Sequence, residues 1–136
     1  MSNFEADLER GLVAEDLVLD KIKIKYPCAV KIEGHHSPYD IWIPEIHKSV
    51  EVKYDPMSNS TGNYVVEVWF NKPSALTVTT ADYWVFYDDI DLVYVEPDKI
   101  KNYILIHNLP IKEFIGPGDY LPKKVYLIKK EILKSI

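Results

Sequence analysis

One long amphipathic segment followed by a series of short alternating segments constrains the fold of this chain more than any other feature. Residues Asn3–Lys25 carry apolar side chains at helical spacing, and Tyr26-Pro27 ends the helix that this spacing predicts. A carboxylate interrupts the apolar stripe of this helix. The stripe expected to face the core comprises Leu8, Leu12, Glu15, Leu19 and Ile22.

The rest of the chain has the composition of β-strands, with Val and Ile alternating with polar residues. The expected strands are Ala29–Glu33, Asp40–Ile43, Ser49–Tyr54, Tyr64–Phe70, Tyr83–Tyr87, Leu92–Glu96 and Val125–Ile128. Residues 44–47 predict a hairpin turn, 55–62 a loop and 98–106 a helix, and 130–136 predict a terminal helical turn or two. Residues 74–80 fit either a connection or a short helix. This order predicts an α/β or α+β sheet domain.

Size and cysteine content narrow the class of protein further. The chain has 136 residues, 47% of them hydrophobic, which predicts one compact domain spanning 1–136. The single cysteine, Cys28, excludes an internal disulfide framework and a cysteine zinc cluster, and favours a reducing cytoplasm. No apolar run approaches the ~18 residues that span a bilayer, and segment 1–10 is acidic where a signal peptide is basic. We therefore expect a soluble cytoplasmic protein without a membrane partner.

Charge is distributed unevenly along the sequence. The net charge of −5 argues against a polybasic arm that binds nucleic acid by charge alone. By segment, the net charge is −4 over residues 1–80, −6 over 81–98 and +5 over 99–136. The C-terminal lysines fit either a solvated face or a surface that binds a nucleic-acid backbone. The lysines considered for nucleic-acid binding are Lys123, Lys124, Lys129 and Lys130.

Asp40, Glu51 and Lys53 form the motif with the clearest chemistry. In their predicted strands Asp40 faces away from the neighbouring isoleucines, and Glu51 and Lys53 face away from the neighbouring valines. The predicted hairpin sets the two strands side by side, so we expect the three side chains to converge. Two adjacent carboxylates repel unless a cation lies between them, and oxygen ligands suit Mg²⁺ or Mn²⁺ better than zinc. The lysine can orient an attacking water or offset charge in a phosphorane-like transition state.

These residues resemble the PD-(D/E)XK nuclease superfamily, and within it the archaeal Holliday junction resolvases and their viral relatives. The resemblance rests on Pro38-Tyr39-Asp40, on Glu51-Val52-Lys53 after a ten-residue gap, and on Glu15 in the preceding helix. A further stretch is similar to a pattern in phage-encoded members of the group. It consists of Thr61-Gly62-Asn63, Glu67, Pro73-Ser74 and Thr80-Ala81-Asp82-Tyr83-Trp84. Together the matching segments cover about residues 5–87.

The resemblance implies a fold and a set of site residues. The fold would be a restriction-endonuclease-like core, with a central mixed β-sheet flanked by helices. Asp40, Glu51 and the backbone carbonyl of Val52 would hold the metal. Glu15 would approach the metal through water, and Lys53 would be the catalytic lysine.

The resemblance also implies that Glu67 and Asn63 lie near the active site. The activity would be that of a Mg²⁺-dependent endodeoxyribonuclease, with Mn²⁺ as a substitute, hydrolysing phosphodiester bonds in double-stranded or branched DNA resembling a Holliday junction. Because both strands of such a substrate need cutting, a homodimer is the economical assembly. A phage or viral origin would place the protein in the host cytoplasm.

Plainer interpretations of the same residues remain open. Asp40, Glu51 and Lys53 also fit a set of exposed cross-strand charges on a half-solvated sheet. Glu15 fits a residue at the helix boundary that reaches water, and Glu67 fits an ordinary polar strand residue.

Other functions remain open as well. His35-His36 fits a surface position better than a metal site, because adjacent histidines point apart in a strand. For the whole chain, the main alternative is a non-catalytic subunit that keeps a nuclease fold for nucleic-acid binding or assembly. An acidic cluster that repels phosphate would serve such a subunit poorly. A nuclease acting on RNA is a third hypothesis.

Overall fold

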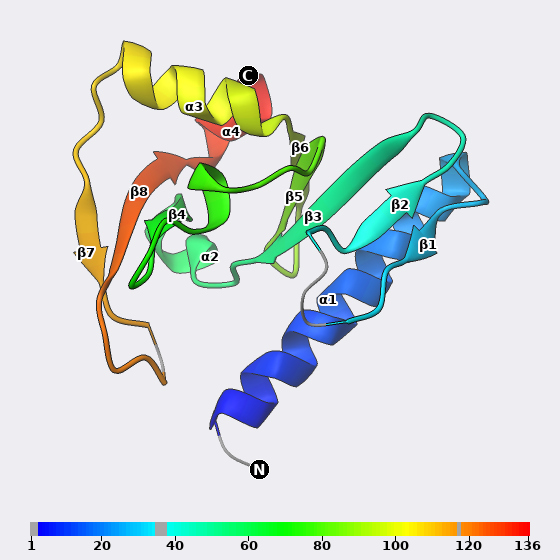
Figure 1. The fold of residues 1–136 in the computed structure, drawn as a ribbon, viewed down its shortest axis with the longest axis horizontal. Coiled ribbons are helices and arrows are strands. Elements are labelled where there is room, and N and C mark those ends of the chain that lie inside the picture. The colour runs from blue at the N-terminus through cyan, green and yellow to red at the C-terminus, as the bar shows by residue number, and fades with distance from the viewer. Residues whose placement is uncertain (1–2, 35–37, 117) are drawn as a thin grey trace.

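The computed structural model describes residues 3–34, 38–116 and 118–136, which form two β-sheets with flanking helices (Figure 1). The helical elements are α1 (Asn3–Lys25), α2 (Ser58–Thr61), the 3-10 turn η1 (Ala75–Thr77), α3 (Pro97–Ile106) and α4 (Lys130–Ser135). The strands are β1 (Val30–Lys31), β2 (Ile41–Ile43), β3 (Lys48–Tyr54), β4 (Asn63–Trp69), β5 (Tyr83–Tyr87), β6 (Leu92–Val95), β7 (Lys112–Phe114) and β8 (Lys123–Lys129).

The larger sheet is mixed, with the strand order β1-β2-β3-β5-β6. The central pair β3 and β5 is parallel, and Glu51 lies opposite Trp84 and Lys53 opposite Phe86. The other neighbours in this sheet are antiparallel. Residues 44–47 form the turn between β2 and β3, so the predicted hairpin is confirmed. The expected α/β class with a mixed sheet is confirmed too.

A second sheet consists of three antiparallel strands in the order β4-β8-β7. In sequence, β4 lies between the parallel strands β3 and β5, so the crossover between these two carries α2, β4 and η1. The edge strand β7 was not expected, because Lys112-Glu113-Phe114 contains no Val or Ile and its three residues are exposed. Pairing with β8 is what makes this segment a strand.

Helix α1 covers one face of the five-stranded sheet (Figure 1). The core on that face contains Val18, Ile22, Ala29, Ile41, Ile43, Val50 and Val85. The predicted buried stripe of α1 is partly wrong, because Leu12 is 46% exposed whereas Ala14 and Val18 are buried. The helix packs through side chains spaced four residues apart, at 14, 18 and 22, which rotates the contact line by about one position. Glu15 therefore lies half-buried at the margin of this line.

The opposite face of the same sheet packs against the second sheet, α3 and α4. Side chains alternate along β5, so Val85 points toward α1 while Trp84 and Phe86 point toward the second sheet. The Tyr64 ring of β4 stacks on Phe86 with 4.6 Å between the ring centroids. Because both faces of the parallel pair β3 and β5 are covered, polar side chains of these strands are partly removed from water.

Several local predictions need correction. The segment 55–62, expected to be a loop, contains the short helix α2. The first predicted strand, Ala29–Glu33, shortens to Val30–Lys31. For segment 74–80 the alternative of a short helix is the one seen, since it contains the 3-10 turn η1. His35-His36 lies outside the described residues. Among the helices of the described ranges, none is long and apolar enough to cross a bilayer.

Candidate functional site

Asp40 lies where β2 and β3 diverge. Its backbone N–H donates to the carbonyl oxygen of Val50 at 2.9 Å, and its own carbonyl accepts from the N–H of Ile32 at 2.8 Å. Two residues further along β3, the Asp40 side chain takes the place of its backbone as the partner, because the Asp40 Oδ2 atom accepts a hydrogen bond from the N–H of Val52 at 2.7 Å. This bond fixes the Asp40 carboxylate against the backbone between Glu51 and Lys53.

Glu15 reaches the same place from α1. Burial, the negative charge of Asp40 and a hydrogen bond with the Asp40 carboxyl raise the pKa of Glu15 from 4.5 to about 7. Lys31 opposes this shift from β1, since its Nζ lies 3.5 Å from Glu15 Oε2 and 3.0 Å from Asp16 Oδ1. A pKa of about 7 lets Glu15 exchange a proton near neutral pH, which is unusual for a carboxyl group.

Glu51 and Lys53 form an ion pair with each other on β3. The second carboxylate oxygen of Glu51 accepts a hydrogen bond from Thr79 Oγ1 at 3.2 Å. The Lys53 ammonium lies over the Trp84 ring, 4.5 Å from its centroid. Both side chains are partly exposed, at 18% for Glu51 and 29% for Lys53, so solvent molecules can reach this pair.

We call Glu15, Asp40, Glu51 and Lys53 the candidate site. Its charged groups form two pairs, Glu15 with Asp40 and Glu51 with Lys53, which adjoin through the N–H of Val52. Within the described part of the chain, no three His, Cys, Asp or Glu side chains are arranged to hold a metal ion. We expected the side chains of these residues to converge on one point. In the structure they form two neighbouring pairs instead of a single cluster.

The donors of the candidate site nevertheless fit Mg²⁺ in chemical type. They are hard oxygen atoms. Burial and the adjacent Asp40 charge disfavour the Glu15 anion, and a divalent cation would relieve the repulsion between the two carboxylates. Glu51 would exchange its contact with Lys53 for such a cation.

Glu67 and Asn63 lie on β4, in the other sheet. Glu67 accepts a hydrogen bond from Ser74 Oγ at 2.7 Å, and its Oε1 lies 3.5 Å from Lys123 Nζ. The backbone N–H of Asn63 donates to Thr61 Oγ1 at 3.1 Å, which closes the turn between α2 and β4. The contacts of these two residues are thus with their own sheet and its connecting segments.

The four candidate lysines have different surroundings. Lys123 is paired with Glu67 and Asp119, while Lys124 is exposed and lies over the Trp69 ring. Lys129 is exposed. Lys130 is only 9% exposed, so the expectation that it is a surface lysine is wrong.

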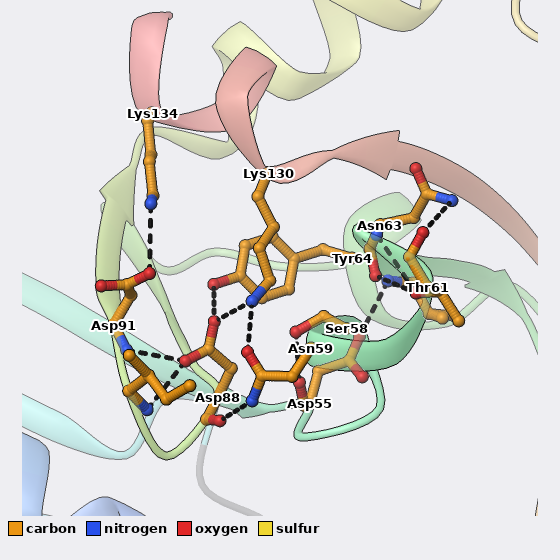
Figure 2. A network of polar contacts seen from close by, with 12 residues as sticks. Asp55, Ser58, Asn59, Thr61, Asn63, Tyr64, Asp88, Asp91, Lys130 and Lys134 are labelled. Atoms are coloured by element: carbon orange, nitrogen blue, oxygen red, sulfur yellow. Dashed lines mark hydrogen bonds and ion pairs between the residues drawn. The ribbon is translucent and has the colours of Figure 1, made fainter.

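Lys130 is buried because it is bound to Asp88, which is fully buried in the turn after β5 (Figure 2). The Lys130 Nζ donates to Asp88 Oδ2 at 2.5 Å and to Asn59 Oδ1 at 2.7 Å. The Tyr64 hydroxyl donates to the same Asp88 oxygen at 2.9 Å. We call Asn59, Tyr64, Asp88 and Lys130 the buried network. It ties α2, β4, the β5–β6 turn and α4 together.

The buried network leaves the Asp88 carboxylate fully satisfied. Its second oxygen accepts from the backbone N–H groups of Ile90 at 2.9 Å and Asp91 at 2.7 Å. Burial alone raises the pKa of Asp88, but these backbone donors, the Lys130 ammonium and the Tyr64 hydroxyl outweigh it and lower that pKa to about 2. Burial and the Asp88 charge raise the pKa of Tyr64.

The acidic segment 82–98 has further structural roles that composition does not reveal. The Asp82 carboxylate accepts from the backbone N–H of Ser49 at 2.8 Å and from its hydroxyl at 3.1 Å. Asp91 pairs with Lys134 at 3.1 Å. Local sequence patterns do not predict these contacts, because each partner is more than thirty residues away in sequence.

Comparison with known proteins identifies no relative of this chain. No family model, no curated protein and no solved structure matches the chain.

Proposed function

We propose that this chain is a Mg²⁺-dependent endonuclease with a restriction-endonuclease-like core that hydrolyses phosphodiester bonds in DNA, including branched DNA. The observation that carries the proposal is the contact of Asp40 with the backbone between Glu51 and Lys53. An exposed cross-strand charge pair needs no such contact, and it needs no glutamate approaching from a helix.

The electrostatics of the candidate site also favour a functional role. Burial and the neighbouring Asp40 carboxyl raise the pKa of Glu15 to about 7, and shifts of this kind cluster at sites that bind a ligand or carry out a reaction. A lysine beside a glutamate, at the partly exposed edge of the same group, supplies a positive charge for an anionic substrate.

The reaction we propose is hydrolysis by in-line attack. A Mg²⁺ ion held by Asp40, Glu51 and the Val52 carbonyl would polarise the phosphate and lower the pKa of its bound water. Lys53 orients the attacking water and donates to a non-bridging phosphate oxygen. The water oxygen bonds to phosphorus as one of its protons leaves, the bond to the 3′ oxygen breaks, and that oxygen takes a proton from solvent, so that a 5′-phosphate and a 3′-hydroxyl result. Glu15 can take up a proton near neutral pH.

The assembly that fits this reaction is a homodimer. Each chain carries one candidate site, and cutting both strands of a duplex or of a junction needs two.

The test is a cleavage panel with plasmid, single-stranded DNA, four-way junction and RNA substrates, each in Mg²⁺, Mn²⁺ or EDTA. We expect cleavage of DNA only with metal. The cleavage rate should fall by at least ~10²-fold in Asp40→Asn, Glu51→Gln and Lys53→Met. Glu131→Gln removes an exposed acid of α4 and serves as the matched control with the wild-type rate.

The same panel separates the alternatives. Undiminished cleavage by folded Asp40→Asn or Glu51→Gln, or cleavage in EDTA, contradicts the proposal. Binding of DNA by the wild-type protein without cleavage under any metal supports the non-catalytic subunit. Preference for RNA changes the substrate class but keeps the candidate site.

A further inference from the structure

A pocket lies apart from the ion pair of Glu51 and Lys53, between the N-terminal half of α1 and the carboxyl ends of β3 and β5. Its volume is about 430 Å³, within the roughly 300–1,000 Å³ typical of small-molecule sites. The polar and aromatic residues of its wall are Glu9, Arg10, Tyr54, Tyr87 and Asp89. The carboxyl ends of parallel strands are where open α/β sheets bind their ligands.

Two tyrosines form a flat wall of this pocket. The rings of Tyr54 and Tyr87 are stacked with 5.8 Å between their centroids and an angle of 27° between their planes. The Tyr54 hydroxyl donates to Asp89, 2.8 and 2.9 Å from its two carboxylate oxygens. Burial and this contact raise the pKa of Tyr54 to about 12, so the ring stays neutral and fixed. A fixed aromatic face suits a planar ligand.

Asp89, another residue that lines the pocket, lies in a turn with its own hydrogen bonds. Asp89 has a φ of 77°, in the left-handed region that few side chains adopt. The turn is held in place by the backbone N–H groups of Ile90 and Asp91, which both donate to the Asp88 carboxylate. Through this turn, the buried network holds Asp89 in position, and Asp89 in turn holds the Tyr54 hydroxyl.

Opposite charges line this pocket at different points. Arg10, the only arginine of the chain, lies close enough to Tyr54 for its charge to counteract the rise in the pKa of that residue. A guanidinium group binds phosphate in a bidentate manner. The carboxylate of Glu9 offers acceptors to the amino group of a ligand.

We propose that this pocket binds a nucleobase that carries a 5′-phosphate. The base lies against Tyr87, the phosphate contacts Arg10, and the exocyclic amino group of adenine, cytosine or guanine donates to Glu9. The ligand is either a free mononucleotide or the unpaired 5′-terminal nucleotide of a DNA strand, since both offer the same chemistry. This inference does not rest on the proposed nuclease, because binding here needs neither metal nor cleavage.

The test is calorimetric binding in EDTA, where a metal cannot contribute. The ligands are dAMP, dCMP and TMP, the nucleosides without phosphate, inorganic phosphate alone, and a single-stranded oligonucleotide with and without a 5′-phosphate. We expect dAMP and dCMP to bind more tightly than TMP and than the nucleosides. Tighter binding of the phosphorylated oligonucleotide than of dAMP identifies a strand end as the ligand, and the reverse identifies a free nucleotide.

Two variants locate the site. Arg10→Gln should weaken dAMP binding by roughly tenfold to a hundredfold, and Tyr87→Leu should weaken dAMP and deoxyadenosine alike, whereas Tyr87→Phe keeps the stacking face and the affinity. Lys101→Gln, in a different open pocket beside α3, is the matched control. Absence of saturable binding by any nucleotide overturns the proposal. So does equal binding of phosphate alone, or equal loss of affinity in Lys101→Gln.

Discussion

The candidate site and the buried network both place carboxylates away from water, with opposite consequences. In the buried network Asp88 has four donors, one of them an ammonium group, and its pKa falls to about 2. In the candidate site, burial and a second carboxyl group beside it raise the pKa of Glu15 to about 7. The fold stabilises the anion of one acid and destabilises the anion of the other.

This difference indicates what each region does. A buried anion whose hydrogen bonds are all satisfied needs nothing further and holds distant segments together. Two adjacent carboxyl groups weaken the native state at neutral pH, and a protein tolerates such a pair where a ligand or a reaction uses it. We therefore interpret Asp88 as a structural residue and the pair of Glu15 and Asp40 as a functional one.

The largest expected effect comes from breaking the buried network. Lys130→Met leaves the Asp88 anion buried without its cation and should lower the free energy of unfolding by ~3–5 kcal/mol, measured by urea denaturation. The double variant Asp88→Asn with Lys130→Met should recover part of this loss, because it removes both charges. Lys129→Met, an exposed neighbour, should change little. Equal stability of Lys130→Met and Lys129→Met would show that the ion pair does not hold the fold.

Because of Glu15 in the candidate site, the free energy of unfolding should fall as the pH rises. Because the folded pKa of Glu15 is about 7 and its ordinary value is 4.5, its stabilising contribution is full below pH 4.5 and is lost as the pH rises through 7. In EDTA, the wild-type protein should lose on the order of 1–3 kcal/mol across this window. Glu15→Gln should abolish the slope. A slope that persists unchanged in Glu15→Gln would assign it to another group.

The buried network should show the opposite dependence. The folded pKa of Asp88 is about 2, below its ordinary value of 3.8, so its contribution is present above pH 3.8 and lost as the pH falls toward 2. The loss should be on the order of 2 kcal/mol in the wild-type protein and should be absent in Asp88→Asn. Thermal melts between pH 2 and 5 measure it. An acid-induced loss of the same size in both proteins would contradict a lowered pKa of Asp88.

The smallest effects concern the backbone that carries each region. A Cβ atom added at Gly11, in the helix that carries Glu15, would meet nothing within 4 Å, so Gly11→Ala should raise stability by up to ~1 kcal/mol. Gly62 caps α2 beside the buried network with a φ of 78°, so Gly62→Ala should lower stability by ~1 kcal/mol although the space around it is also open. Urea denaturation of both variants checks the two signs. A gain in Gly62→Ala would contradict the strain argument.

The sequence predicted the elements whose signal is local. The bounds of α1 and β5 match the prediction, and β3 begins one residue earlier than expected. Alternation along the hairpin correctly predicted that Ile41, Ile43 and Val50 are buried. The contact line of α1 was misplaced, because Ala14, a small side chain outside the predicted stripe, is buried whereas Leu12 is exposed.

Contacts between segments that are distant in sequence could not be predicted from local sequence patterns. The pairing of Lys130 with Asp88 spans 42 residues, and in sequence Lys130 looks like any lysine of a basic segment. Strand β7 forms only because β8 lies beside it. For the candidate site, the spacing of Asp40, Glu51 and Lys53 predicted that these residues lie on neighbouring strands close to one another. It did not predict that Lys53 forms an ion pair with the Glu51 carboxylate.

The most direct test of the contrast is metal-dependent DNA cleavage by Asp40→Asn compared with Asp88→Asn, with each rate normalised to the folded fraction of the protein. We predict that Asp40→Asn stays folded and loses cleavage by at least ~10²-fold. Asp88→Asn should lose stability but cleave at the wild-type rate per folded molecule. Wild-type cleavage by Asp40→Asn would contradict a functional role for the candidate site.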